Sequence, residues 1–426
     1  MCRNKYSNDI FIITLVFFMG CSASLYSTNI DSTLSIDTSK KVSYPVIIQD
    51  SPSKLFTMRQ FNQNYLSAYR YLSTELLDNV PVKTSLFIQA IATLITNPLT
   101  HEEGHRSILT SLGIGSISQP YYNLQGAAYV NGVTDVTLQN LRDNNLPTYV
   151  RLHTAGLESD YMLTNRMEEL IVFDFDERRY MYVDYFIRKT SMVGYYLLGM
   201  APKLNIELQE EKNELKRDIV GNDVYGAVKN LFRPDIPFYR YTNYDDLTKE
   251  EKKFVTRAGY RSLLNLASPM FFKPLRFIRK ENAKLSVSLG YTMCPFGDFI
   301  DENIYLQLYK KYNVHIYFRQ FENKNMWFPA GGVSLVNYQI TPKFNTTLSA
   351  QLWSQPKQMD FNTSESQFGG SGDVLLKYIF LSTHSGNAIS IDAGVNYKTY
   401  GFLPEEVIMG EHWGVRWGTT IYLNRK

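Results

Sequence analysis

The chain has 426 residues, of which 44% are hydrophobic and 20% are charged, and its formal net charge is +3. This length exceeds one ordinary hydrophobic core, so two domains are expected. The composition excludes a disordered chain, and the nearly balanced charge gives no reason to expect a nucleic-acid partner.

Residues 1–21 have the pattern of an export signal. A basic start precedes an apolar stretch at residues 10–19, which is shorter than the about 20 residues of a membrane-spanning helix. The sequence at residues 18–21 (FMGC) resembles a bacterial lipobox, and this resemblance implies a lipid on Cys21. Cleavage near Ala23 by an ordinary signal peptidase is the alternative. Either signal predicts a protein of the cell envelope.

Residues 30–280 show mainly the spacing of amphipathic helices and are expected to form a helical domain. A helix that contains residues 86–95 is expected to end at Pro98. Thr100 and Glu103 then have the spacing of a capping box, which predicts the start of the next helix. Similar start signals predict two further helices, at Pro147 and at Thr248.

From residue 283 onward, apolar and polar residues alternate, which predicts β-strands with one apolar and one polar face. About eight segments of about ten residues show this alternation, and short and long connections alternate between them. The pattern resembles a small outer-membrane β-barrel, with short periplasmic turns and long external loops. We therefore expect an α+β multidomain protein, in which a helical domain precedes an antiparallel β-barrel of about eight strands at residues 283–426.

The two faces of these strands differ in polarity. Ile391, Val415 and Trp417 lie on the apolar face, whereas Asp392 and Arg416 lie on the opposite face. In an outer-membrane barrel the first group faces lipid and the second faces the interior. The alternative is a soluble antiparallel sheet or barrel that packs its apolar face on the helical domain.

The motif with the clearest chemistry is at residues 101–105 (HEEGH). Residues four apart on a helix project from the same side, so His101 and His105 can bind one zinc ion. Glu102 is placed to take a proton from a water that the metal activates. The motif resembles that of the zincin metallopeptidases, and this resemblance implies a zinc-dependent hydrolase that acts on peptides or proteins.

A catalytic zinc site needs a third protein ligand and one open position. The resemblance to gluzincins, whose third ligand is a Glu on a following helix, implies Glu158. Position 162 is Met where those enzymes usually have Asp, and helical periodicity places Glu158 on a polar face. Asp160 and His153 share a more apolar face and stay open as alternatives. Asp160 could instead orient a ligating His.

These patterns together predict a zinc metallopeptidase in the outer membrane, with its helical domain facing the periplasm. Lipid on Cys21, the barrel, or both would attach it. The expected partners are a peptide or protein substrate and the membrane, and not nucleic acid. The alternative is a non-enzymatic outer-membrane or cell-envelope protein in which the motif helix is inactive.

Overall fold

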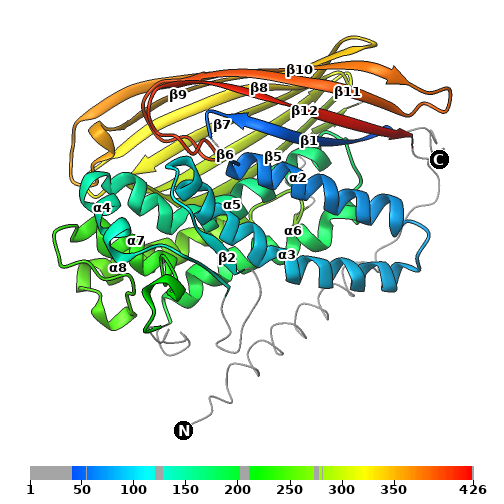
Figure 1. Ribbon diagram of the computed structural model, residues 1–426. Helices are drawn as coiled ribbons and strands as arrows, with labels where there is room; N and C mark the ends of the chain where they lie inside the picture. Colours follow the sequence, from blue (N-terminus) through cyan, green and yellow to red (C-terminus); the bar gives the residue numbers. More distant parts are fainter. Residues whose placement is uncertain are drawn as a thin grey trace.

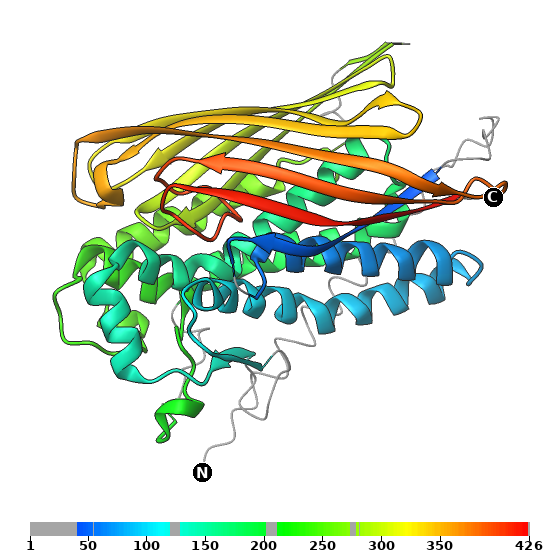
Figure 2. The same ribbon diagram turned by 45° about the horizontal axis from the view of Figure 1, so that its top comes forward.

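The computed structural model describes residues 41–53, 55–119, 128–201, 211–272, 278–280 and 282–424. These residues form two layers, a long curved antiparallel sheet and a layer of helices that covers one of its faces (Figures 1 and 2). The expected helical region and the C-terminal antiparallel sheet are confirmed. The export signal and Cys21 lie outside the described residues.

The helical layer is formed by described residues between the first strand and residue 266. Its helices are α2 (Met58–Tyr71), α3 (Val82–Ser111), α4 (Asp135–Asn144), α5 (Leu146–Val172), α6 (Arg178–Gly199), α7 (Asp223–Phe232) and α8 (Lys249–Ser262). Two short strands, β2 (Ile117–Gln119) and β3 (Tyr129–Asn131), form a separate hairpin. Within the described part of the chain, no helix has both the length and the apolar character needed to cross a membrane.

Two predicted helix starts have different outcomes. Thr248 caps α8 with a complete capping box, because Thr248 and Glu251 each accept a hydrogen bond from the other's backbone N–H. The predicted boundary at Pro98 is wrong, because α3 runs through Pro98 as one helix of 30 residues. Thr100 therefore lies inside α3, where its hydroxyl donates to carbonyls of the preceding turn. Packing of α3 on α2, α5 and α6 stabilises the helix despite the missing N–H of Pro98.

The sheet has ten strands in the order β1-β12-β11-β10-β9-β8-β7-β6-β5-β4. Their bounds are β1 (Lys41–Ser51), β4 (Ile278–Lys280), β5 (Ala283–Cys294), β6 (Gly297–Leu308), β7 (Tyr312–Glu322), β8 (Trp327–Thr341), β9 (Phe344–Pro356), β10 (Ser366–Ser382), β11 (Ala388–Lys398) and β12 (His412–Asn424). The eight expected strands are thus β5 to β12. The first strand of the chain, β1, pairs with the last, β12, so the sheet includes residues from the expected helical domain. The pairing order of the described strands is open, with β1 and β4 at its ends.

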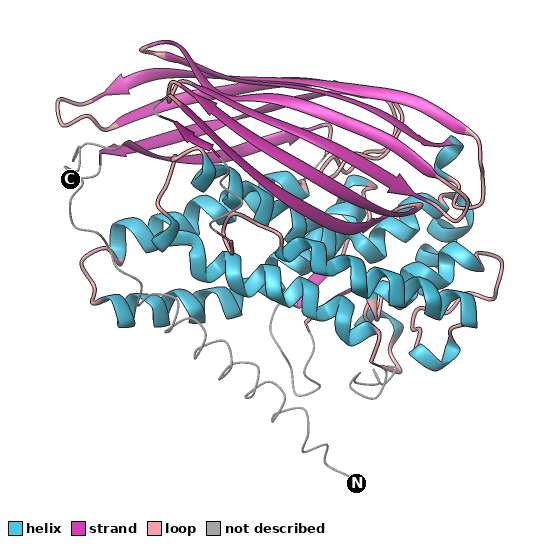
Figure 3. Ribbon diagram, turned by 180° about the vertical axis from the view of Figure 1, so that it is seen from behind, coloured by secondary structure: helices cyan, strands magenta, loops and turns pink. Residues whose placement is uncertain are grey.

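The sheet turns its polar face toward the helices and its apolar face outward. Ile391, Val415 and Trp417 are 52%, 54% and 52% exposed, whereas Asp392 is 5% exposed. The side chain of Arg416, on the same face as Asp392, is 11% exposed. The alternative in which the sheet packs its apolar face on the helical domain is therefore wrong. Figure 3 shows the helices lying together on one side of the sheet.

The inner face of the sheet has an apolar part and a polar part. Phe299 of β6 belongs to a large buried cluster that also contains Phe254 of α8. Nearby, the inner face is polar, and Arg319 of β7 pairs with Asp301 of β6 at 2.6 Å. The hydroxyl of Tyr161 on α5 donates to the same Asp301 carboxylate at 2.6 Å. Both an apolar core and hydrogen-bonded charges thus join the two layers.

The connections at one end of the sheet pack on the helices. The connection from β5 to β6, expected to be long, is a tight turn at residues 295–296. The two longest connections, at residues 357–365 and 399–411, carry the buried residues Phe361 and Phe402. Both phenylalanines belong to the same cluster as the helical residues of α7 and α8, so these connections are part of the core and not free external loops.

Two phenylalanines near this end of the sheet differ in burial, one in the connection after β11 and one on the outer face of β10. Phe402 is fully buried and Phe368 is 85% exposed. Replacing Phe402 by Ala should lower the free energy of unfolding by about 3–5 kcal/mol, because it leaves a cavity in the core. Phe368→Ala should change it by less than about 0.5 kcal/mol. Denaturant unfolding of both variants under the same conditions measures the difference, and equal losses would contradict the burial of the connection and the outward direction of Phe368.

Candidate metal centre

Two histidines of α3 face the same point between α3 and α5. The Nδ1 atom of His105 lies 2.6 Å from the carbonyl oxygen of Leu152, which accepts only, so Nδ1 carries the proton. The Nδ1 atom of His101 lies 2.8 Å from Oδ2 of Asp160. Both Nε2 atoms are therefore left to face Asp223, whose Oδ2 lies 3.0 Å from His101 and 3.4 Å from His105. This is the arrangement by which proteins orient metal-binding imidazoles.

Asp223 completes a group that could hold a metal ion. Among the described residues, one ligand atom from each of His101, His105 and Asp223 lies within 4.8 Å of the other two. His105 and Asp223 are buried, and the His101 side chain is 16% exposed. Two imidazoles and one carboxylate are a usual ligand set for catalytic zinc, which keeps a further position open.

Two glycines allow the histidines of α3 to lie against α5. A Cβ atom at Gly156 of α5 would lie 2.3 Å from Nε2 and 2.5 Å from Cδ2 of His101, and 2.5 Å from Nε2 of His105. A side chain here would therefore collide with both rings and displace them. At Gly104 of α3 a Cβ atom would lie 2.5 Å from the carbonyl oxygen of Ala155, so Gly104 permits the close approach of the two helices. The residues present fit a zinc ion.

Hydrogen bonds and burial set the charges of the ligands. Burial lowers the pKa of His101, but its hydrogen bonds to Asp160 and Asp223 outweigh burial and raise the pKa above its ordinary value. Burial raises the pKa of Asp223, but the positive charge of His105 and the hydrogen bond from His101 outweigh it, so the pKa of Asp223 is lowered. Asp223 is thus held as the carboxylate, which is the form that binds a cation.

Glu102 is the buried acid next to this group. It is 7% exposed, and burial raises its pKa to about 7, with the neighbouring His105 and His101 limiting the rise. A carboxyl group with a pKa near neutrality can both accept and return a proton under physiological conditions. Asp218, whose pKa burial raises to about 8, has Glu102 as its main charged neighbour.

Tyr195 of α6 also lies at the site. Its ring centroid is 6.2 Å from that of His101, and its hydroxyl accepts a hydrogen bond from the backbone N–H of Asp223 at 3.1 Å. Burial raises the pKa of Tyr195 well above its ordinary value, so the hydroxyl keeps its proton. Tyr195 can therefore donate a hydrogen bond to a bound group.

The structure does not bring the expected third ligand, Glu158, to the histidines. α5 turns Glu158 toward the sheet, where its carboxylate pairs with Arg151 at 2.6 Å, both side chains being fully buried. Of the two alternatives, Asp160 lies beside His101, where it orients the ring. His153 is packed against Gly226, and neither of its ring nitrogens has a hydrogen-bond partner in the part of the chain that the structure describes. Burial lowers the pKa of His153 to about 3, so it is a neutral core residue.

Asp223, which the structure places beside the two histidines, carries little signal in the sequence. It lies 122 residues after His101, at the first position of α7. Asn222 caps that helix, and an acidic residue in a first helical turn is common because of the helix dipole. The Asn-Asp pair at 222–223 therefore resembles an ordinary helix start. Its role depends on where α7 packs.

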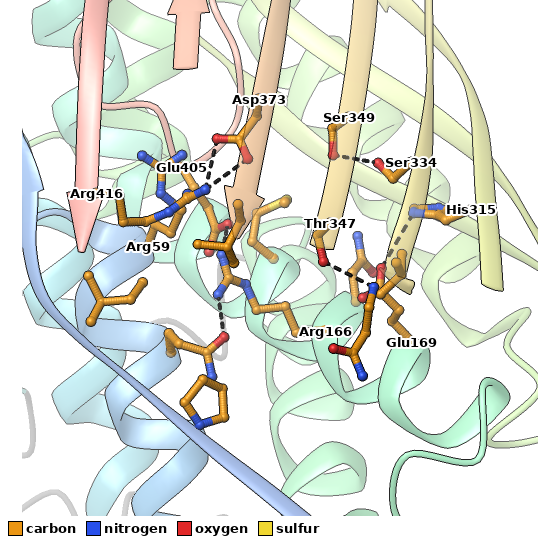
Figure 4. Close-up of a pocket in the computed structure, with 18 of the residues that line it drawn as sticks. Arg59, Arg166, Glu169, His315, Ser334, Thr347, Ser349, Asp373, Glu405 and Arg416 are labelled. Carbon is orange, nitrogen blue, oxygen red and sulfur yellow. Dashed lines mark hydrogen bonds and ion pairs between the residues drawn. The ribbon is translucent and has the colours of Figure 1, made fainter. Parts of the chain in front are cut away.

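A polar cavity of about 400 Å³ lies between the sheet, α2 and α5 (Figure 4). Its charged groups pair with one another: Arg416 bonds both oxygens of Asp373 at 2.8 Å, and Arg166 lies 2.5 Å from Glu405. The α5 residues that line the cavity, among them Arg166, are on a different side of the helix from Gly156. The cavity and the metal centre are therefore separate.

Comparisons with known proteins give no assignment for the chain. No family model matches it, and neither the curated proteins nor the solved structures contain a significant match.

The space at Gly156 can be tested directly. Gly156→Ala should prevent metal binding, because the new methyl group would collide with both imidazole rings and displace the two Nε2 atoms. Gly194→Ala is the matched control, since Gly194 also lies in a helix and a Cβ atom there would meet no other atom within 4 Å. Metal content by mass spectrometry, measured beside thermal unfolding, gives the answer. Full zinc content in folded Gly156→Ala protein would place the site elsewhere.

Proposed function

We propose that this protein is a zinc-dependent hydrolase and, by the likeness of residues 101–105 to the zincin motif, a metallopeptidase. The observation that carries the proposal is the convergence of the Nε2 atoms of His101 and His105 on Oδ2 of Asp223. The donor set of two imidazoles and one carboxylate supports zinc.

Each residue of the site has a separate task in this proposal. His101, His105 and Asp223 would hold the ion, and Asp160 and the Leu152 carbonyl fix the two rings. When bound, zinc supplies a Lewis acid that polarises a carbonyl group and lowers the pKa of water.

Two groups beside these ligands would handle protons and developing charge. Glu102 takes a proton from the water that attacks the peptide carbonyl and returns it to the leaving amine. A pKa near 7 suits Glu102 to both steps. The hydroxyl of Tyr195 donates a hydrogen bond to the oxygen on which negative charge develops.

Replacing Glu102 by Gln tests the chemistry. Glu102→Gln keeps the size of the side chain but removes the base, so hydrolysis of a peptide library should fall by about 10²–10⁴-fold while zinc stays bound. Glu103→Gln is the control, because Glu103 is also buried but pairs with Arg106 at 3.0 Å. Peptide cleavage is followed by mass spectrometry and zinc content is measured on the same samples. Zinc-loaded wild-type protein that cleaves no peptide would favour the alternative, a non-enzymatic envelope protein with an inactive motif.

The outer face of the sheet supports a second proposal, which concerns location. We propose that this face contacts the lipid of the outer membrane as the wall of a barrel-like structure, with the helical layer directed to the periplasm. On β9 to β12 the outward positions carry no charged residue, and many are large and exposed: Leu348, Leu352, Phe368, Val374, Leu376, Tyr378, Phe380, Ile391, Val395, Trp413, Val415, Trp417 and Ile421. An apolar surface of this extent is not typical of a protein surrounded by water.

Aromatic pairs lie toward both ends of this surface. Tyr397 packs on Trp413, and Phe344 packs on Tyr378, with ring centroids 4.8 Å apart in each pair. On β10 the register places Tyr397 opposite residue 372 and Phe344 opposite residue 378. Six residues span about 20 Å along a strand, which is close to the about 25 Å height of the apolar band of outer-membrane barrels. This spacing supports aromatic contacts at the two borders of the lipid layer.

A charge placed on the outer face tests the contact with lipid. Val395→Arg should destabilise the membrane-inserted protein by about 2–4 kcal/mol, because the outward residue Val395 pairs with Val374, between the two aromatic pairs. Gln320→Arg, at an exposed position near the end of β7, should cost about 0–1 kcal/mol. Membrane fractionation and unfolding in lipid vesicles compare the two variants. If both variants fractionate and unfold like the wild type, the face does not lie in lipid.

A further inference from the structure

The connection between β11 and β12, residues 399–411, folds into the space between the sheet and α5. The ammonium group of Lys398 at its base donates to the carbonyl oxygens of Gly401 at 2.6 Å and Met409 at 3.1 Å, which holds the two ends of the connection together. Phe402 is fully buried, and Gln355 of β9 bonds both its N–H and its carbonyl oxygen. The connection, hereafter the β11–β12 loop, is therefore a fixed part of the interior.

A buried ion pair of α5 holds this loop. Arg151 bonds both carboxylate oxygens of Glu158, at 3.1 and 2.6 Å, and both side chains are fully buried. The same guanidinium donates to the carbonyl oxygens of Glu406 at 2.7 Å, Val407 at 3.3 Å and Leu403 at 3.3 Å. The Glu158 carboxylate accepts the backbone N–H of Glu405 at 2.8 Å. The pair thus makes four hydrogen bonds to the loop backbone.

The stretch of α5 between these two residues also forms one wall of the metal centre. The Leu152 carbonyl, next to Arg151, orients His105, and Gly156, two residues before Glu158, faces both Nε2 atoms. At 100° per residue, Arg151 and Glu158 lie on the side of α5 opposite Gly156. A shift of this turn of the helix would therefore move the His105 acceptor and the contact of Gly156 with both histidine rings at the same time.

The side chains of the loop tie it to further elements. Arg166 of α5 bonds the Glu405 carboxylate at 2.5 Å, as seen beside the polar cavity in Figure 4. The Glu406 carboxylate is 3.3 Å from Arg59 of α2 and accepts a hydrogen bond from Asn396 of β11 at 3.2 Å. The position of the loop therefore depends on the sheet and on two helices. The loop contacts α5 through Arg151 and Glu158.

We propose that Arg151 and Glu158 are positioning residues that transmit the placement of the β11–β12 loop to the metal centre. The proposal rests on the proposed function of the metal centre. A buried ion pair is not by itself a strong source of stability, and an apolar pair of similar volume is often as stable. Here the pair fixes the backbone of five loop residues, 403–407, by hydrogen bonds. It does so on the far side of the α5 turn that carries Leu152 and Gly156.

Metal affinity of the full-length protein, measured with cobalt and zinc against a competing chelator, tests this role. Arg151→Met should weaken metal binding by about tenfold or more, because changes in the groups that orient metal ligands have effects of this size. It should also change the absorption spectrum of bound cobalt, which reports the coordination geometry. Arg70→Met is the matched control, since Arg70 and Asp176 form a fully buried pair at 2.7 Å that lies outside the metal centre.

A double variant separates positioning from folding. Arg151→Met with Glu158→Met removes both charges, so no unpaired charge stays buried and the fold should recover. The metal affinity should stay low, because the hydrogen bonds to the loop are still missing. A folded double variant with the affinity and cobalt spectrum of the wild type would overturn the proposal, as would an equal loss of affinity in Arg70→Met. If neither the wild type nor Asp223→Ala bound metal, the assignment of the metal centre would be wrong. The positioning role of Arg151 and Glu158 would then be wrong as well.

Discussion

The close approach of α3 and α5 is the contact on which the candidate site depends. Gly104 of α3 lies so near the Ala155 carbonyl oxygen that a Cβ atom would be 2.5 Å from it. That approach brings the Leu152 carbonyl to His105 and the carboxylate of Asp160 to His101. Hydrogen bonds at both Nδ1 atoms fix the rings, so the geometry of the candidate site is set by helix packing. A larger residue at position 104 would separate the helices and release both rings.

A second constraint on the structure is that the sheet places a polar face inside the protein. Its inner face carries charged residues such as Arg319, and each must be paired when buried. The structure meets this requirement with Asp301, which also accepts from Tyr161 of α5. Near the connections at one end, aromatic residues replace the charges and form the shared core. The apolar side chains that would form the core of a soluble sandwich face outward instead.

The β11–β12 loop connects these two parts of the molecule. Its backbone is bonded by Arg151 and Glu158 on the side of α5 that faces the sheet, while the other side of that turn faces the histidines. A group first expected to bind metal, Glu158, thus belongs to the support of the site. Such a link makes the geometry of the candidate site depend on the folded sheet.

The sequence by itself determined those features that follow from backbone periodicity. The alternation in β11 and β12 predicted that Ile391 and Trp417 would share a face opposite Asp392, and the spacing of His101 and His105 predicted that both would project together. These relations hold wherever the segment packs, because they are set by two residues per strand repeat and 3.6 residues per helical turn.

Tertiary structure decided the rest. In the sequence Asp223 resembles an ordinary first residue of a helix, and only the packing of α7 against α5 brings it to the histidines. Glu158 resembles a metal ligand in the sequence, but in the fold it binds Arg151 and the β11–β12 loop. The pairing of β1 with β12 and the passage of α3 through Pro98 likewise depend on contacts between segments far apart in the chain. Periodicity gives the direction of a side chain from its own helix or strand, but the partner that it meets depends on how those elements pack, and that arrangement is a property of the whole fold.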